Sequence, residues 1–468
     1  TGSPERYAPC TECASYGAPP TQEMDSHLAH PLYDSCARRL VAWWNVLLVF
    51  FLVLRLASAQ PSLENGLLSS HSRDDLVEKL TELIHELITE FREGDELPGP
   101  PPPGAVRLAS FNAALVGENP KGQEGSLFDM LVEGSEEISL AAETIQRVRP
   151  DILALKEFDY DPSGETLDLF KEKYLEVPQA DDVEGISYTY SMQIVSNTGV
   201  LSRADLNNDG NISLPDDGYG FGFYPGQFAF AILSVFPFDE KAMRSWRLFK
   251  WKDMPGNRIR NTNPPDYYSP EAVAELRLSS KNHIDLPVAV TTDDDEYTFH
   301  MLVSHPTPPA FDQPFLYNVQ RNADEIRLWI DYLDVNATYL VDDRGRRTKG
   351  LADLKANFAV FGDQNNDPNG GDGINEVIER LIEHPRIARF PTPASLGGLE
   401  NNDTSRESIP PAFHTADFAL RVDYVLPSKT FNVLKSEVIW PSTESRFNYL
   451  VNASDHRMVY ADVRRKKK

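Results

Sequence analysis

The sequence predicts a domain of the α/β or α+β class in which helices cover β-sheets. From Val106 onward, short runs of β-branched and aromatic residues alternate with longer stretches whose apolar residues recur every three or four positions. The short runs are typical of strands and the longer stretches of amphipathic helices. Their mixed order along the chain is typical of a layered fold of sheets and helices, and no internal repeat is seen.

These patterns define a first set of elements. We expect strands at residues 106–112, 151–158, 228–236, 297–305, 356–365 and 421–428. We expect helices at residues 135–149, 318–334 and 373–383. A separate amphipathic helix is expected at residues 72–94, where Ser72 can cap the N-terminus and the leucines form one apolar stripe.

The N-terminal segment has the features of a secretory signal. We interpret residues 1–23, which precede the first methionine, as untranslated or leader sequence. Residues 24–59 are expected to be a signal peptide, because a basic pair is followed by the apolar run 40–54 and then by small residues suited to cleavage. The protein is therefore predicted to be secreted or extracellular, without stable membrane insertion after cleavage. The alternative is a signal anchor that stays at the cell surface.

Composition sets the remaining boundaries and excludes some functions. Residues 60–104 are expected to be the amphipathic helix and a proline-rich linker, residues 105–463 the main domain, and residues 464–468 a basic tail. The formal net charge of −26 argues against tight binding of nucleic acid. All three cysteines precede residue 60, which excludes a cysteine nucleophile and disulfides from the main domain.

Polar side chains end many of the predicted strands. They are Asn112, Glu157, His305, Asp363, Asn365 and Asp423, and a Ser-Asp-His sequence follows at residues 454–456. Any one of them could be a turn residue. Groups at strand ends can also converge at one edge of a sheet, where sites are commonly built. Asp363 and Asn365 are two positions apart on a segment expected to be extended, so their side chains should point the same way.

Seven stretches, in their order, resemble the endonuclease/exonuclease/phosphatase superfamily of metal-dependent phosphoesterases. They are ASFN, RPDILALKEFD, FAILSVFPF, LVSHP, VFGDQNNDP, RVDYVL and SDH, spread over residues 105–463. The resemblance implies a four-layer α/β/β/α sandwich of two packed, mainly antiparallel sheets flanked by helices. It also implies hydrolysis of phosphate esters at a site on one edge of the sandwich.

The resemblance implies a metal-binding side of this site. Glu157 matches the metal-binding glutamate, Asn112 lies beside it, and Asp455 matches a second acid on the metal side. Mg²⁺ or Mn²⁺ is the expected ion, since a hard cation prefers carboxylate and amide oxygens and neutralises charge on a phosphoryl group.

Five further residues are implied to act on water and phosphate. Asp363 matches the aspartate that orients or deprotonates the attacking water, and Asn365 the amide that holds the phosphate. Asp423 matches a supporting carboxylate. His305 and His456 match two histidines that contact the scissile phosphate, where an imidazole can donate a hydrogen bond or a proton.

Two positions depart from the family pattern. Lys156 stands where Gln or Asn usually precedes the metal-binding glutamate, and Gln364 stands where an apolar residue usually follows the aspartate. Lys156 could pair with Glu157, bind phosphate or weaken metal binding. These departures leave open a catalytically silent calcium-binding protein on the same fold.

Residues 205–216, DLNNDGNISLPD, fit the spacing of a calcium-binding loop. The expected Ca²⁺ ligands are Asp205, Asn207, Asp209, Asn211 and Asp216. No clear helix is predicted on either side, and an ordinary surface loop of Asn, Asp and Gly is the alternative.

The sequence as a whole predicts a secreted, metal-dependent hydrolase of phosphate mono- or diesters. The favoured substrate is a small phosphate ester, with nucleic acid a weaker partner; a secreted endonuclease of the DNase type is the alternative enzyme. The identity of the substrate and the oligomeric state stay open.

Overall fold

The computed structural model describes residues 97–401 and 410–467. The predicted leader (1–23), signal peptide (24–59) and amphipathic helix (72–94) lie outside the described residues. Within the described ranges, no helix combines the length and the apolar character needed to cross a membrane.

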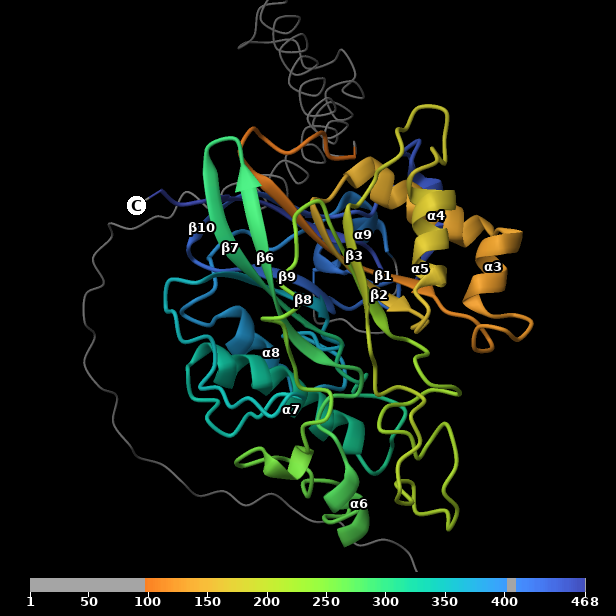
Figure 1. The fold of residues 1–468 in the computed structure, drawn as a ribbon, viewed down its shortest axis with the longest axis vertical. Coiled ribbons are helices and arrows are strands. Elements are labelled where there is room, and N and C mark those ends of the chain that lie inside the picture. Colours follow the sequence, from red (N-terminus) through yellow and green to blue (C-terminus); the bar gives the residue numbers. More distant parts are fainter. Residues whose placement is uncertain (1–96, 402–409, 468) are drawn as a thin grey trace, which may run out of the picture. The chain divides into compact units, whose positions relative to one another are not determined.

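Two sheets form the centre of the described domain (Figure 1). The first has six strands in the order β10-β11-β1-β2-β4-β3 and the second has five in the order β5-β6-β7-β8-β9. The strands of the first sheet are β1 (Val106–Leu115), β2 (Ile152–Phe158), β3 (Tyr190–Ile194), β4 (Phe230–Ser234), β10 (Phe431–Val438) and β11 (Val459–Arg465). Those of the second are β5 (Arg244–Ser245), β6 (His283–Thr292), β7 (Asp295–Ser304), β8 (Asn357–Asp363) and β9 (Asp423–Pro427). Only β1–β2 and β7–β8 pair in parallel among these strands, so both sheets are mainly antiparallel.

Helices cover the outer face of each sheet (Figure 1). The first sheet carries α3 (Leu127–Glu133), α4 (Glu136–Val148) and α5 (Glu165–Phe170), which runs into the single π-helical turn η1 (Lys171–Leu175). The second carries α6 (Pro270–Glu275), α7 (Tyr317–Leu333) and α8 (Asn375–Ile382). The shorter elements are α9 (Leu396–Glu400) and the 3₁₀ turns η2 (Trp251–Asp253), η3 (Pro411–Phe413) and η4 (Asn448–Ala453). Helix α4 begins where Ser135 Oγ accepts a hydrogen bond from the amide of Ile138, a normal N-cap.

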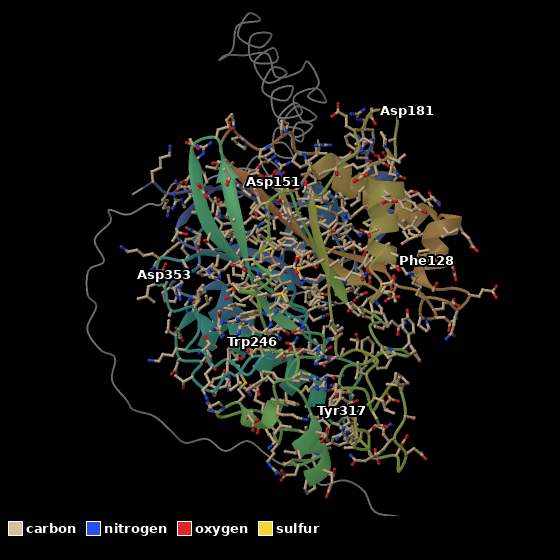
Figure 2. The ribbon with its side chains drawn as sticks, in the orientation of Figure 1. Phe128, Asp151, Asp181, Trp246, Tyr317 and Asp353 are labelled. Carbon is tan, nitrogen blue, oxygen red and sulfur yellow. The ribbon has the colours of Figure 1, made fainter. Side chains whose placement is uncertain are left out.

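The alternation of side chains along each strand explains the layers. In β2, Leu153 and Leu155 pack under α4, whereas Ile152 and Ala154 face the second sheet. A third cluster lies between the second sheet and α7 and includes Trp246, which is labelled in Figure 2. Apolar side chains therefore fill the space between the sheets as well as the space under both helical layers, which gives the predicted four-layer α/β/β/α sandwich.

The structure also contains strands that the sequence did not predict. Every strand and helix predicted within the described residues is present, but β3, β5, β6, β10 and β11 were not predicted. Strand β11 continues to Arg465, whose guanidinium pairs with Asp295, and Lys467 pairs with Asp294. The first residues of the expected basic tail, 464–468, thus belong to a strand rather than to a solvated end.

Candidate active site

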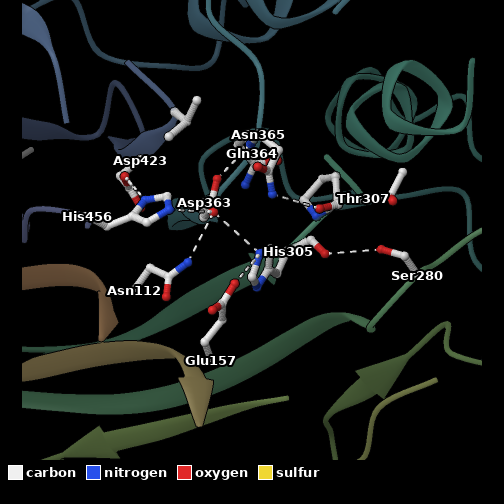
Figure 3. Close-up of polar contacts among 12 residues, drawn as sticks. Asn112, Glu157, Ser280, His305, Thr307, Asp363, Gln364, Asn365, Asp423 and His456 are labelled. Carbon is white, nitrogen blue, oxygen red and sulfur yellow. Dashed lines mark hydrogen bonds and ion pairs between the residues drawn. The ribbon is translucent and has the colours of Figure 1, made fainter. Parts of the chain in front are cut away.

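The predicted site residues come from both sheets and meet at one end of the sandwich. Figure 3 shows Asp363 at the centre, with Asn112, His305, Asp423 and His456 around it. Strand β8 ends at Asp363, which faces Asp423 across the antiparallel β8–β9 pair. Strand β7 runs parallel to β8 and is followed at once by His305, so the two strand ends lie at the same edge. The pairing of the strands therefore explains why residues far apart in sequence come together.

Asp423 and His456 form a buried carboxylate–imidazole pair. His456 Nδ1 lies 2.8 Å from Asp423 Oδ2, and His456 Nε2 lies 3.7 Å from Asp363 Oδ2. Burial by itself lowers the pKa of His456, but the two carboxylates outweigh it and raise the pKa to about 10. Burial raises the pKa of Asp423 to about 6, against the opposing effect of His456. At neutral pH the imidazole is therefore protonated and held between two acidic side chains.

Asp363 is the most strongly acidic group of the site. Burial opposes its ionisation, yet His456 and His305 together hold the pKa of this carboxyl well below its usual value. Its Oδ1 accepts a hydrogen bond from the amide of Asn365 at 2.7 Å, and its Oδ2 accepts one from Asn112 Nδ2 at 3.3 Å. The ionised carboxylate is thus fixed by donors on both oxygens.

His305 differs from His456 in its protonation. Its side chain is 1 % exposed, and its Nε2 lies 3.4 Å from Asp363 Oδ2 and 3.8 Å from Glu157 Oε1. Burial and the nearby Lys281 lower the pKa of His305 to about 3, so the ring is neutral. The ring is enclosed between the two carboxyl groups, and its contact with a substrate phosphate stays a prediction.

Glu157 and Asn112 lie on the other side of Asp363. Glu157 has a φ of 52° at the end of β2, which turns its side chain away from the strand alternation. Burial raises the pKa of Glu157, although a quarter of its side chain is exposed (25 %). A partly exposed carboxylate beside an amide fits a hard divalent cation such as Mg²⁺ or Mn²⁺.

Asp455, the second predicted metal ligand, is exposed. Its Oδ1 accepts a hydrogen bond from Ser454 Oγ at 3.3 Å, and the same hydroxyl donates to the backbone oxygen of Asn112 at 2.8 Å. No hydrogen bond joins the Asp455 carboxylate to Glu157 within the described part of the chain. Ser454 therefore connects Asp455 to Asn112, and the role of Asp455 as a metal ligand stays a prediction.

A second group of acidic and histidine side chains has the spacing of a metal site. Asp363, Asp423 and His456 each present one ligand atom within 4.8 Å of the others. Asp423 and Asp363 raise the pKa of His456, which favours the protonated imidazole, and a protonated imidazole has no lone pair for a metal. The group is therefore better suited to proton transfer than to metal binding.

The backbone after Asp363 differs from the expected extended segment. Strand β8 ends at Asp363 and Asn365 has a φ of 51°, so the expectation that both side chains follow strand alternation is wrong at this point. Asn365 instead turns back, so that its amide N–H bonds Asp363 and its Nδ2 donates to the oxygen of Pro306 at 3.1 Å. Gly362, one residue before Asp363, permits the close approach of β8 to the end of β7, because a Cβ there would lie 2.0 Å from the oxygen of Ser304.

The two departures from the family pattern lie beneath the site. Lys156 is 0 % exposed, its Nζ has no hydrogen-bond partner, and it sits 4.2 Å from the centre of the Phe230 ring. Burial lowers the pKa of Lys156 well below its usual value. Gln364 is also 0 % exposed, and its Nε2 donates to Ser304 Oγ at 3.1 Å. Neither side chain faces the solvent side of the site.

Sequence reasoning missed two residues that build the site. Glu325 on α7 accepts hydrogen bonds from the amide of Ser280 at 2.6 Å and from that of Thr307 at 2.8 Å. It thereby ties the segment before β6 to the segment after His305. Lys281 follows Ser280 and is nearly buried. For Glu325, the signal in the sequence was an acidic residue on the apolar side of the predicted helix 318–334. For Lys281, it was a polar cluster directly before an apolar run.

The predicted calcium loop is a compact turn. Asp205 Oδ1 accepts a hydrogen bond from the amide of Asp209 at 3.2 Å, and its Oδ2 accepts one from the amide of Gly210 at 2.8 Å. Asp217, which is buried, binds the amide of Ser213 at 2.8 Å and closes the base of the loop. The predicted ligand Asp216 is exposed, as are Asp209 and Asn211, whereas Asp205 and Asn207 are half-buried.

The chain is similar to several solved structures at low sequence identity. A search of curated proteins gives no match. An endonuclease/exonuclease/phosphatase from Beutenbergia cavernae is 17 % identical, with 77 % of this chain and 72 % of that chain covered and a TM-score of 0.41. The human Nocturnin catalytic domain with bound sulfate is 16 % identical, with coverage of 78 % and 94 % and a TM-score of 0.40. Beta toxin from Staphylococcus aureus is 12 % identical, with coverage of 76 % and 99 % and a TM-score of 0.37.

The family model named Endonuclease/Exonuclease/phosphatase family matches residues 133–456, well over half of the chain. That range includes Glu157, His305, Asp363, Asp423 and His456, and Asn112 precedes it. Members of the family are generally divalent-metal-dependent hydrolases of phosphoester bonds. The protein belongs to the endonuclease/exonuclease/phosphatase family.

Proposed function

We propose that the protein is a metal-dependent phosphoesterase that hydrolyses small phosphate mono- or diesters by attack of a water molecule. One observation carries the proposal: the buried Asp363 carboxylate and His456 imidazole lie side by side, with Nε2 and Oδ2 3.7 Å apart, an arrangement that lowers the pKa of Asp363 and raises that of His456. Such a pair provides a proton acceptor and a proton donor within reach of one reacting group.

Each residue then has a distinct task. Asp363 orients the attacking water and accepts its proton, while His456 donates a proton or hydrogen bond to the phosphate ester. Asp423 fixes the orientation of His456 through the 2.8 Å contact with Nδ1. Glu157 and Asn112 would hold Mg²⁺ or Mn²⁺, which supplies neutralisation of the phosphoryl charge. Asn365 would position the phosphate.

The environments of Lys156 and Gln364 favour an active enzyme over a catalytically silent binding protein. Both side chains are buried below the site and leave Asp363, Glu157 and His456 unobstructed. The acidic balance of the chain, with a net charge of −26, favours a small substrate over long nucleic acid.

A panel of substrates tests the proposal. The protein is assayed on generic phosphomonoesters, phosphodiesters, plasmid DNA and sphingomyelin, each with Mg²⁺, Mn²⁺ or Ca²⁺. We expect turnover of a small ester that depends on the metal and is lost in Asp363→Ala by about 10²-fold or more. Asp372→Ala is the matched control, since it removes an exposed acid of the same segment. Near-normal turnover by a folded Asp363→Ala variant would remove this residue from the mechanism.

We also propose that the loop 205–216 binds Ca²⁺. The support is the ligand spacing and the backbone turn around Asp205, and the ion would stabilise the folded protein. A ligand at a hundredfold excess over its dissociation constant stabilises by about 2.7 kcal/mol. We expect calcium to raise the melting temperature of the wild type and not that of Asp205→Ala. A wild type whose melting temperature calcium leaves unchanged would refute the site.

Finally, we propose that the protein is secreted. The support is the sequence pattern of residues 24–59, which lie outside the described residues. Expression of the full chain and N-terminal sequencing of protein from the medium would test cleavage after Ala59. Protein that stays with the cell and keeps residues 40–54 would support the signal-anchor alternative.

A further inference from the structure

Strands β1 and β2 are irregular where they carry the proposed metal ligands. In this parallel pair, Asn112 is opposite the residue before Glu157 and Leu115 is opposite the residue after it, so two residues of β1 face Glu157 alone. Such a β-bulge can re-aim a side chain. Ala114 has a φ of 50° and Glu157 a φ of 52°, values that residues other than glycine rarely adopt. The surrounding structure must therefore hold Glu157 in this conformation.

The backbone just beyond Glu157 is fixed through Asp159, a residue with no task in the proposed mechanism. The amide of Asp159 donates to the oxygen of Leu115 at 3.3 Å, and the backbone oxygen of Asp159 accepts a hydrogen bond from Gln193 Nε2 at 3.0 Å. Leu115 is the first paired residue of β1 after the bulge, and Gln193 belongs to β3. These two bonds tie the chain directly after the bulge to two other strands of the first sheet.

The carboxylate of Asp159 joins two loops at the same point. Its Oδ2 accepts hydrogen bonds from the amide of Gly117 at 2.7 Å and from the hydroxyl of Tyr224, and its Oδ1 accepts one from the amide of Phe228 at 3.0 Å. Gly117 follows β1, whereas Tyr224 and Phe228 precede β4. Asp159 is 7 % exposed, and donors occupy both of its carboxylate oxygens. Among the described residues, no hydrogen bond joins this carboxylate to Glu157, so its influence on Glu157 passes through the backbone.

We propose that Asp159 is a positioning residue for the metal ligand Glu157. By fixing the chain immediately after the bulge, Asp159 holds the Glu157 carboxylate in the orientation that binds the divalent cation. This inference rests on the metal-binding role given to Glu157 in the proposed function. Residues that orient a metal ligand without touching the ion typically cost tenfold to a hundredfold in metal affinity when they are replaced. Asp159 should therefore control the affinity for metal while making no contact with substrate.

Binding of Mn²⁺ to the full chain, measured by calorimetry without substrate, tests this role. The binding event that is scored is the one that Glu157→Gln weakens, which separates it from ions held by the loop 205–216. Asp159→Asn keeps the size of the side chain but leaves a single oxygen to accept hydrogen bonds, so at least one of the three donors loses its acceptor. We expect Asp159→Asn to raise the Mn²⁺ dissociation constant by roughly tenfold to a hundredfold. Tyr224→Phe, which removes one donor, should raise it less.

The control is another buried acid of the same sheet. Asp462 on β11 is 1 % exposed and pairs with Arg107. We expect Asp462→Asn to lower the free energy of unfolding and to leave the Mn²⁺ dissociation constant unchanged. An equal weakening of Mn²⁺ binding in Asp462→Asn would overturn the inference, because the effect of Asp159→Asn would then be a general loss of stability.

A double variant shows whether Asp159 acts through Glu157. If it does, adding Asp159→Asn to Glu157→Gln should weaken Mn²⁺ binding by no more than about twofold further, because the ligand being positioned is already lost. Losses that multiply in the double variant would overturn the inference, as would unchanged Mn²⁺ binding in folded Asp159→Asn. If Asp159→Asn does not fold, Tyr224→Phe decides, and an unchanged Mn²⁺ dissociation constant there overturns it.

The same measurements separate this inference from the proposed function. A wild type whose Mn²⁺ binding depends on both Glu157 and Asp159, but which hydrolyses no ester, would refute the phosphoesterase function and support the positioning role. A wild type that hydrolyses esters with Mn²⁺ affinity independent of Asp159 would keep the function and overturn the positioning role.

Discussion

The substitution Asp423→Asn tests the proton balance of the site most directly. The pKa of His456 is raised from 6.5 to about 10 by two carboxylates, one at 2.8 Å and the other at 3.7 Å. Asn preserves the size of the side chain and removes the closer charge. We expect the pKa of His456 to fall by about 2 units or more, which corresponds to about 2.7 kcal/mol. Burial of the ring, which Asp363 and Asp455 then oppose, acts in the same direction.

The direction of this pKa shift also determines the pH range in which His456 stabilises the folded protein. Because the folded pKa of His456 lies above its unfolded value, its contribution to stability is complete below pH 6.5 and is lost as the pH rises through about 10. In Asp423→Asn much of this contribution disappears, and the variant becomes less dependent on pH in this range. Since Asp423 no longer fixes the orientation of His456 through the charged 2.8 Å contact, turnover should fall on the order of 10²-fold.

The assay is NMR of the protein with ¹³C-labelled histidine, with the His456 signal assigned by its absence in His456→Gln. We expect the wild-type signal to show no midpoint below pH 9, and the Asp423→Asn signal to have its midpoint near or below pH 8. A wild-type His456 that titrates near pH 6.5 would refute the assignment of a protonated donor. Superimposable titrations of wild type and Asp423→Asn would refute the role given to Asp423.

Three further predictions follow from the same contacts. Glu157→Gln should raise the Mg²⁺ concentration needed for half-maximal activity, because it removes the charge of the partly exposed ligand; an unchanged metal titration would contradict its role. Asp462→Asn should lower the free energy of unfolding in urea by about 3–5 kcal/mol, since Arg107 Nε lies 2.7 Å from Asp462 and both side chains are 1 % exposed; a loss below 1 kcal/mol would contradict this. Binding to duplex DNA should be weak, and tight binding with a log–log salt slope steeper than about −4, unchanged by deletion of residues 464–468, would assign the protein to the nucleases instead.

Most of the strands that the sequence revealed carry or directly precede a polar site residue, and β4 is the exception. Strands β2 and β8 are continuous apolar runs buried on both faces, so their pattern is unambiguous. Strand β6 was missed because Pro287 interrupts it, and proline in a run argues against a strand. Strand β10 is buried only at its two ends and includes the polar residues Lys435, Ser436 and Glu437, so its hydrophobic signal is weak.

Some site residues could be predicted because they lie in recognisable strands, whereas others are brought together only by packing. Asp363, Asp423 and Glu157 lie in recognisable strands and could be predicted from order and context. Lys281 precedes β6 and Glu325 lies within α7, so their convergence depends on how the second sheet and its helix pack. The turn at Asn365 is held by hydrogen bonds to Asp363 and to Pro306, and Pro306 lies far from Asn365 in sequence.

The division of the site between the two sheets links catalysis to the packing of the protein interior. Asn112 and Glu157 belong to one sheet, while Asp363 and Asp423 belong to the other, and the layer between them is filled by apolar side chains such as Leu286 and Phe361. The volume of these side chains sets the distance between the two sheets, and therefore the distance between the two halves of the site. Substitutions that change their volume would shift the two halves of the site against each other, so the geometry of the site depends on the size of core residues as well as on the charged groups.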